Sequence, residues 1–170
     1  MIGFRGCGKS TIGRALADRL GRDFVDTDDL IEQEAGKSIS EIFRVEGERG
    51  FRDREEKIIA RCAQLSQPTI VALGGGAVLR AANRQAIRRS GRCVWLQATV
   101  ATHLERLTSD PQSRTRRPAL TSQTLEKEIA VVLQSREPLY AELAEKTVSV
   151  DHRTPDDIVL ELMDWLNVND

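Results

Sequence analysis

The sequence is poor in the residues that build disulfide frameworks and metal centres. Its 170 residues include three cysteines without a C-x-x-C spacing and two isolated histidines, which argues for reduced thiols and against a zinc site. No apolar run approaches the roughly 20 residues that a membrane span needs, and the start Met1-Ile2-Gly3 leaves no room for a signal peptide. We therefore expect a cytoplasmic protein without a membrane partner.

The sequence also lacks an excess of charge of either sign. It has 25 basic and 26 acidic residues and a formal net charge of −1, so it gives no reason to expect a nucleic-acid partner. The hydrophobic fraction of 40% and the charged fraction of 30% are ordinary for a globular protein. A chain of this length fits a single domain over residues 1–170, and a monomer is the simplest expectation.

Apolar segments of strand length alternate with longer segments of helical periodicity, which is typical of βαβ units and a parallel sheet. Strands are predicted at residues 2–4, 24–26, 69–73, 93–96 and 147–150. Helices are predicted after Ser10, from Leu125 to a kink or end at Pro138, and over 156–166. Two segments interrupt the alternation: a helical insertion at about 27–57, and a polar stretch at about 108–121 that we interpret as a lid.

Residues 3–10 read Gly-Phe-Arg-Gly-Cys-Gly-Lys-Ser and match the phosphate-loop pattern G-x-x-x-x-G-K-S/T. Glycines let backbone N–H groups point at a phosphate chain, and the helix that begins near Lys9 offers the positive end of its dipole. Lys9 would reach the β- and γ-phosphates of ATP, and the hydroxyl of Ser10 would hold Mg²⁺. The predicted nucleotide contacts in this loop are Gly6, Cys7, Gly8, Lys9, Ser10 and Thr11.

The strand that leads into the phosphate loop is unusually short. Only Met1 and Ile2 precede Gly3, whereas strands commonly have five or six residues. A doubly wound fold with so short a first strand is expected to have an apolar slot at the centre of its sheet. We hypothesise that the natural chain starts a few codons upstream or has been trimmed, and the intact mass of the natural protein would test this.

Two acidic residues stand where the second predicted strand ends, close to the phosphate site in this topology. Asp26 and Asp28 are two residues apart, so in an extended chain their carboxylates would face the same way. Asp26 is predicted to contact the waters around Mg²⁺, and Asp28 to accept a hydroxyl proton from a substrate. The alternative for Asp28 is a helix N-cap ahead of Leu30 and Ile31.

Three glycines directly follow the third predicted strand, at Gly74, Gly75 and Gly76. At the carboxyl edge of a parallel sheet, such glycines let a ligand approach the backbone closely. A flexible turn is the alternative interpretation.

Two arginines outside the lid are candidate ligands. Arg136 lies on the apolar stripe of its helix, where a charge requires a partner and an anionic ligand would provide one. Arg52 has an alternative, since it could pair with Glu55 or Glu56 at i+3 or i+4 on a helix surface.

The polar stretch at 108–121 contains three further arginines. Arg117, beside Pro118, would neutralise charge on a transferred phosphoryl group when a lid closes. For Arg114 and Arg116 we expect a solvated loop position.

Taken together, these segments resemble the shikimate kinase family across essentially the whole chain. The resemblance implies a P-loop, nucleoside-monophosphate-kinase-like α/β fold with a five-stranded parallel sheet flanked by helices, a substrate-binding insertion and a lid. The segments that carry it are GFRGCGKST at 3–11, DTD at 26–28, Phe51-Arg52 with Glu55, LGGGAV at 73–78, RRPAL at 116–120 and REPLY at 136–140.

The resemblance implies a role for each matched residue. Arg52 and Arg136 would bind the carboxylate of shikimate, and Asp28 would bind its ring hydroxyls and act as the base in transfer of the ATP γ-phosphate to the 3-hydroxyl. Lys9 and Arg117 would contact the ATP phosphates, while Ser10 and, through water, Asp26 would hold Mg²⁺. The remaining implied contacts are Arg153 near the adenine, Gly74, Gly75 and Gly76 near shikimate, and Phe43 and Phe51 lining its pocket.

Two other functions remain possible at this point. Another P-loop small-molecule kinase, such as a gluconate kinase, would keep the phosphate loop without needing Arg52 and Arg136 for shikimate. A nucleotide-binding regulatory module without turnover is the second alternative, and the joint presence of four residues argues against it: Lys9, Asp28, Arg117 and Arg136.

Overall fold

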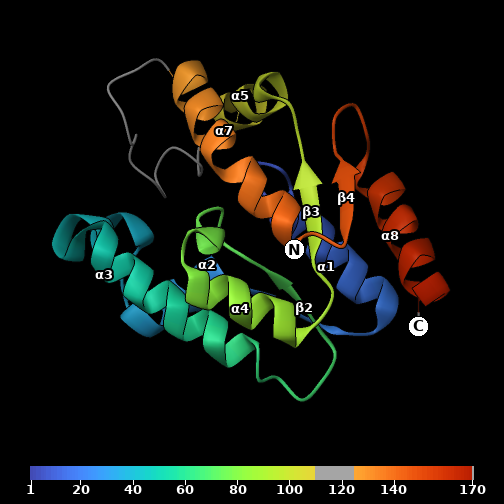
Figure 1. The fold of residues 1–170 in the computed structure, drawn as a ribbon, viewed down its shortest axis with the longest axis horizontal. Helices are drawn as coiled ribbons and strands as arrows, with labels where there is room; N and C mark the ends of the chain where they lie inside the picture. The colour runs from blue at the N-terminus through green and yellow to red at the C-terminus, as the bar shows by residue number, and fades with distance from the viewer. Residues whose placement is uncertain (110–124, 170) are drawn as a thin grey trace.

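The computed structural model describes residues 1–109 and 125–169, and it is an α/β structure whose strands are short and parallel (Figure 1). The strands are β1 Asp23–Asp26, β2 Thr69–Ala72, β3 Val94–Gln97 and β4 Lys146–Ser149. The helices are α1 Lys9–Leu20, α2 Thr27–Ala35, α3 Ile39–Cys62, the 3-10 turn η1 Ala77–Leu79, α4 Ala81–Ser90, α5 Val100–Ser109, α7 Leu125–Leu143 and α8 Pro155–Asn169.

The described strands form two parallel pairs, β1 with β2 and β3 with β4. Asp23 lies opposite Thr69 in the first pair, and Val94 lies opposite Lys146 in the second. The predicted five-stranded sheet is therefore not confirmed, because the described residues contain four strands. The four that form lie within one residue of their predicted positions.

The start of the chain lies between these two pairs and joins them by hydrogen bonds. The Met1 amino group donates to the carbonyl of Val71 over 2.6 Å, and the N–H of Leu73 donates to the carbonyl of Met1 over 3.0 Å. On the other side, Ile2 forms a single parallel bridge with Trp95. Two residues thus take the place of a central strand between β2 and β3.

Gly3 ends this extended run. Its φ of +139° is a conformation that favours glycine, and a Cβ here would lie 2.5 Å from the carbonyl oxygen of Leu96. The strand predicted at 2–4 is consequently wrong beyond Ile2, because the chain must turn at Gly3 to enter the phosphate loop.

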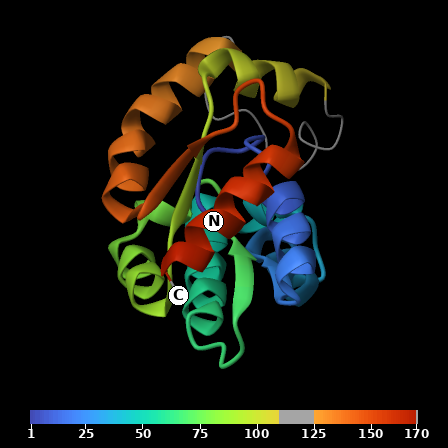
Figure 2. The ribbon, with the colours of Figure 1, turned by 90° about the vertical axis from the view of Figure 1, so that its right-hand side faces the viewer.

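Helices cover both faces of the strands (Figures 1 and 2). Val94 and Leu96 of β3 pack in a cluster with α1 and α8, whereas Trp95 between them packs in another cluster with α3, α4 and α7. Alternate residues of one strand are buried on opposite faces, which explains why its sequence is continuously apolar. α7 runs through Pro138 to Leu143, so of the two predicted effects of this proline, a kink or an end, the end of the helix is wrong.

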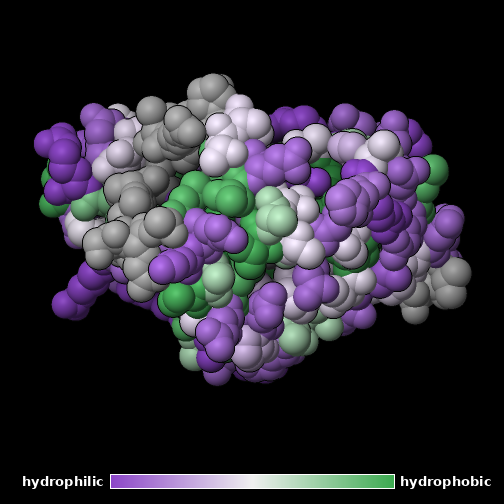
Figure 3. Space-filling view, turned by 90° about the horizontal axis from the view of Figure 1, so that it is seen from above, coloured by the Kyte–Doolittle hydropathy of each residue, from purple (hydrophilic) through white to green (hydrophobic). Residues whose placement is uncertain are grey.

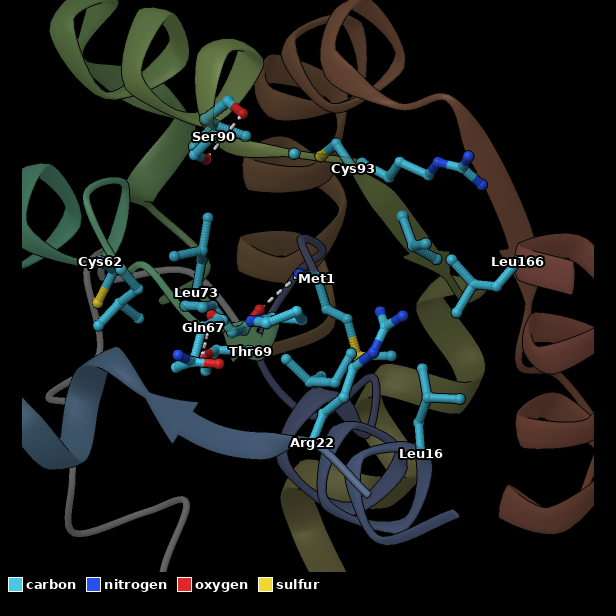
Figure 4. A pocket seen from close by; sticks show the side chains of 18 of the residues that line it. Met1, Leu16, Arg22, Cys62, Gln67, Thr69, Leu73, Ser90, Cys93 and Leu166 are labelled. Atoms are coloured by element: carbon cyan, nitrogen blue, oxygen red, sulfur yellow. Dashed lines mark hydrogen bonds between the residues drawn. The ribbon is translucent and has the colours of Figure 1, made fainter. Parts of the chain in front are cut away.

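A pocket of about 450 Å³ lies beside Met1, where the apolar slot was expected (Figure 4). Thr69 at the start of β2 and Cys93 just before β3 line it, together with Leu16 of α1 and Leu166 of α8. Met1 thus lies between the hydrogen-bonded part of the strands and this pocket.

Within the described residues, no helix combines the length and the apolar character needed to cross a bilayer.

α2 and α3 pack on each other around Ile31, Ile42 and Phe51. A capping box of Ser38 and Glu41 starts α3, and Gly47, with φ +70°, breaks its helical geometry before Phe51. The second half of α3 is thereby redirected, and it carries Arg52 and Glu55 into the interior.

Candidate active site

The phosphate loop, residues 3–10, leads from the start of the chain into α1. Gly6 has φ +78° and Gly8, the N-cap of α1, has φ +93°, so both positions favour glycine. The Lys9 ammonium donates to the carbonyls of Gly3 and Phe4 over 2.9 and 3.0 Å. The loop is therefore curled around the lysine side chain, with the N-terminus of α1 at its mouth.

A cleft of about 700 Å³ lies over this loop, at the edge where the strands end. The arrowheads of β3 and β4 point to that edge in Figure 1, and Figure 3 looks onto it from above. The predicted site residues that line the cleft are Gly6, Gly8, Lys9, Ser10, Thr11, Asp26, Asp28, Gly75 and Arg153. Cys7, by contrast, is fully buried and is not among the residues that line the cleft.

The predicted metal ligands meet in this cleft. Ser10 donates its hydroxyl hydrogen to Asp26 Oδ2 over 2.5 Å. Burial raises the pKa of Asp26, while the Ser10 hydrogen bond acts in the opposite direction. A hydroxyl and a partly desolvated carboxylate in contact are oxygen ligands of the kind that Mg²⁺ binds, so these residues fit the ion. No cluster of three or more His, Cys, Asp or Glu side chains suited to a metal occurs among the described residues.

Asp28 lines the same cleft, but it lies in a helix and not in the extended chain that we expected. Asp26 is the N-cap of α2, and its Oδ1 accepts the backbone N–H of Asp28 over 2.9 Å. The N-cap alternative for Asp28 is therefore wrong. Asp28 lies in the first turn of α2 and lines the cleft together with residues of the phosphate loop.

Thr27, between these two aspartates, connects the end of β2 to the glycine turn that follows it. Its buried hydroxyl donates to the carbonyl of Ala72 over 3.3 Å and accepts the N–H of Gly74 over 3.1 Å. The end of β1 is thereby fixed to the glycine turn after β2. We did not single out Thr27 from the sequence, although its place between two candidate residues was a usable signal.

The two candidate arginines both approach the glycine turn at Gly74–76. Arg136, 8% exposed, donates from Nη1 to the carbonyl of Gly75 over 3.2 Å, and Tyr140 donates to the same oxygen over 2.5 Å. A Cβ on Gly76 would lie 2.3 Å from Nη2 of Arg52. The Arg52 guanidinium therefore occupies the space that a side chain at Gly76 would take, and even an alanine there would displace it.

Arg52 is 8% exposed and pairs with Glu55, which is fully buried, over 2.6 Å. The pairing of Arg52 with the residue at i+3 was one of the two pairings we predicted. The prediction that this pair lies on the helix surface is wrong, because both partners are buried. Phe43 and Phe51 stack with ring centroids 4.7 Å apart, and Phe51 is fully buried beneath Arg52.

The predicted nucleotide-contacting residues outside the phosphate loop are Arg153 and Arg117. Arg153 lines the cleft and donates to Glu161 over 2.6 Å and to the carbonyl of Asp157 over 3.1 Å. Arg117 lies outside the described residues, as do Arg114, Arg116 and the predicted lid from residue 110 onward. Residues 108 and 109, predicted to begin the lid, are the last residues of α5.

Arg106 was missed by sequence reasoning. It extends from α5 into the cleft, where its guanidinium donates to the carbonyls of Gly6 and Val150 over 3.4 and 3.2 Å. An arginine in the last turn of a helix is common at a C-terminus, so its sequence position carried no signal for a site.

Comparison with known proteins identifies the family. The family model described as shikimate kinase matches residues 5–167. The shikimate kinase of Rhodopirellula baltica is 46% identical over 96% of this chain and 87% of its own length, and that of Symbiobacterium thermophilum is 42% identical over 98% and 94%. The chain belongs to the shikimate kinase family.

Solved structures of shikimate kinases agree in fold. The enzyme from Acinetobacter baumannii in complex with shikimate superposes with a TM-score of 0.91 at 34% identity, covering 99% of this chain and 91% of that one. The enzyme from Bacteroides thetaiotaomicron gives 0.84 at 27% identity, covering 98% and 97%. A gluconokinase from Sinorhizobium meliloti, at 0.60 and 20% identity over 94% and 85%, shares the fold alone.

Family membership confirms the predicted enzyme class. The chain is an ATP-dependent, Mg²⁺-using shikimate kinase of P-loop α/β fold, which transfers phosphate to shikimate in the pathway to aromatic amino acids. The gluconate kinase alternative and the regulatory alternative are thereby set aside.

Proposed function

We propose that the cleft carries out phosphoryl transfer with the donor held at the phosphate loop and shikimate held at the glycine turn. The observation that supports this most directly is the convergence of two buried guanidinium groups on that turn: Arg136 contacts Gly75, and Arg52 fills the space beside Gly76. Guanidinium groups bind carboxylates through parallel N–H···O hydrogen bonds, so two arginines at one turn suit a carboxylate ligand. The carboxylate of shikimate is the group that we assign to them.

Asp28 is proposed as the base. It lines the same cleft as the phosphate loop and Gly75, so the hydroxyl of a substrate anchored at the glycine turn would be within reach of both. Asp28 would take the proton of the 3-hydroxyl, the hydroxyl oxygen would bond to the γ-phosphorus, and the bond from that phosphorus to the bridging oxygen of ADP would break. Catalysis then depends mainly on positioning and charge.

The other proposed groups neutralise the phosphates. Lys9 would exchange the carbonyls it now contacts for the β- and γ-phosphate oxygens, and Arg117 would add charge at the transferred group. Ser10 would bind Mg²⁺ directly and Asp26 through water, and the ion would supply further neutralisation of the phosphate oxygens. Arg153 would lie near the adenine, and Gly74 and Phe43 would border shikimate, while Phe51 would act from beneath Arg52, against which its ring packs.

Arg136→Met tests the acceptor half of this proposal, because methionine fills most of the space without charge. We expect the KM for shikimate to rise about 100-fold, corresponding to about 3 kcal/mol for a lost charged hydrogen-bonded pair, while the KM for ATP stays within about twofold. ADP release would be followed with shikimate and, as a blank, with gluconate. Arg88→Met, which removes an exposed arginine paired with Glu142, is the matched control.

Equal changes in the two KM values for Arg136→Met would reject the assignment of its guanidinium to shikimate. Asp28→Asn tests the base separately, with an expected fall in kcat of about 100-fold or more. Near-normal turnover in that variant would remove Asp28 from the chemical step.

Two finer expectations rest on the family assignment alone. We propose that the enzyme is a monomer and acts in the cytoplasm. Light scattering during size-exclusion chromatography would measure the first, and fractionation of cells that express the protein would measure the second.

A further inference from the structure

An ion pair outside the predicted site connects the phosphate loop to the helix that carries Arg136. Arg5, at a variable position of the phosphate loop, donates from Nη2 to Glu128 Oε1 over 3.1 Å. Glu128 is 2% exposed and Arg5 is 18% exposed, so the carboxylate lies in the interior and the arginine borders the cleft. A carboxylate is desolvated at this depth only when something compensates for it, and Arg5 supplies the compensating charge.

Glu128 and Arg136 are on the same helix, α7, and eight residues separate them. Eight residues correspond to about two turns and a rise of about 12 Å, which places both side chains on one face of the helix. That face contacts the site at two points: Glu128 holds the phosphate loop through Arg5, and Arg136 with Tyr140 holds the carbonyl of Gly75.

The loop and the turn are also in contact with each other. A Cβ built on Gly75 would lie 3.2 Å from the backbone nitrogen of Arg5 and 3.4 Å from the carbonyl oxygen of Gly3. The phosphate loop, the glycine turn and α7 therefore form a closed set of contacts. If the Arg5–Glu128 contact is lost, α7 keeps its attachment at Gly75 and its apolar packing of Ile129 and Leu133 with Phe4 of the phosphate loop, but it loses a directional, charged contact that helps to set its rotation and height relative to that loop.

We propose that Arg5 and Glu128 are a positioning pair, which holds α7 at the rotation and height that place the Arg136 guanidinium in register with the phosphate loop. The pair would act on the acceptor through Arg136, and neither member needs to touch shikimate for this effect. The inference rests on the proposed role of Arg136 and extends it by naming what fixes that arginine relative to the donor site.

Glu128→Gln is the primary test, because it keeps the shape of the side chain and removes the charge that holds Arg5. We expect the KM for shikimate to rise about tenfold and the KM for ATP to change less than about twofold. Glu126→Gln is the matched control: Glu126 lies in the same first turn of α7 but is exposed. If Glu128 acted only by stabilising the helix dipole, both variants would behave alike, and that result would overturn the proposal.

The second test is a double-mutant cycle with Arg5→Met. If the two residues act as one unit, the double variant should show the same shikimate KM as the more affected single variant. Fully additive effects on that KM would overturn the proposal, because they would mean that the residues act independently. Glu128→Asp covers the case in which the glutamine variant folds poorly: it keeps the charge but shortens the reach, so we expect a smaller rise in the shikimate KM, and an unchanged KM would count against the pair.

Arg136→Met, measured in parallel, separates this inference from the function it rests on. A rise in the shikimate KM for Arg136→Met without one for Glu128→Gln would reject the positioning role and leave the site assignment intact. No rise in either variant would reject the site assignment itself.

Discussion

Gly76→Ala provides the sharpest prediction about the acceptor site, because a single methyl group would meet the Arg52 guanidinium. The added Cβ would lie 2.3 Å from Nη2 and 2.4 Å from Nη1, whereas non-bonded heavy atoms are comfortable at about 3.5 Å. The guanidinium must therefore move by roughly 1 Å, and a displacement of that size at a positioning group can cost about 100-fold in rate. The backbone of Gly76, with φ −99°, accepts alanine without strain.

We expect this variant to lower kcat/KM for shikimate by about 10- to 100-fold, with the KM for ATP unchanged within about twofold. Steady-state ADP release at varied shikimate and varied ATP measures both. Gly36→Ala is the control, since Gly36 has φ +61° and open space around it: it should lower stability and leave both KM values unchanged. A Gly76→Ala enzyme with normal shikimate kinetics would show that the position of Arg52 against the turn does not matter for the acceptor.

Three further predictions concern stability and can be measured by thermal or urea unfolding. Glu55→Gln removes the buried partner of Arg52 and leaves the more exposed Glu48, 3.3 Å from Nη2, so it should cost up to about 3–5 kcal/mol; a loss below about 1 kcal/mol would mean that the buried pair is not needed. Burial lowers the pKa of His103 to about 4, so as the pH falls the unfolded state binds a proton at this histidine before the folded state does. The free energy of unfolding should therefore fall by up to about 3 kcal/mol as the pH drops from 6.5 to 4. His103→Gln should flatten that part of the pH profile of stability, and an unchanged profile would contradict the assignment. Burial likewise lowers the pKa of the Met1 amino group, so the free energy of unfolding of this chain should rise as the pH increases toward 8.0. Three apolar residues joined before Met1 should remove that pH dependence and add about 1–3 kcal/mol by filling the pocket, whereas a Gly-Ser-Gly extension should add much less. Equal gains from the two extensions would show that the pocket is not the cause.

The parts of the fold that were predicted correctly depend on local sequence. The phosphate loop and the start of α1 follow from glycine spacing and from Lys9, and β3 follows from an apolar run that both faces of the sheet require. The strand predicted at residues 2–4 is reduced to one bridge at Ile2, because the chain turns at Gly3 to enter the phosphate loop.

The parts that were missed depend on contacts between distant segments. The i+3 spacing of Arg52 and Glu55 is the same for an exposed pair and a buried one, and the break at Gly47 is what directs this pair inward. Arg5 and Glu128 are 123 residues apart, so their contact needs the packing of α7 on the phosphate loop. Arg136 was the exception, because a charge on an apolar stripe is visible in the sequence alone.

The segment Asp26-Thr27-Asp28 shows how one short motif can organise a whole site. Asp26 bonds Ser10 at the proposed metal position and caps α2, Thr27 bonds both Ala72 and Gly74, and Asp28 faces the cleft. The middle residue is therefore the structural one, since its hydroxyl locks the glycine turn to the end of β1. These hydrogen bonds fix the proposed base relative to the proposed carboxylate site, because Asp28 directly follows Thr27 and Gly74, whose N–H donates to Thr27, begins the glycine turn. Phosphoryl transfer needs the donor, the base and the acceptor held in a fixed arrangement. Two buried side chains connect the elements that would hold them: Thr27 joins α2 to the glycine turn, and Glu128 joins α7 to the phosphate loop.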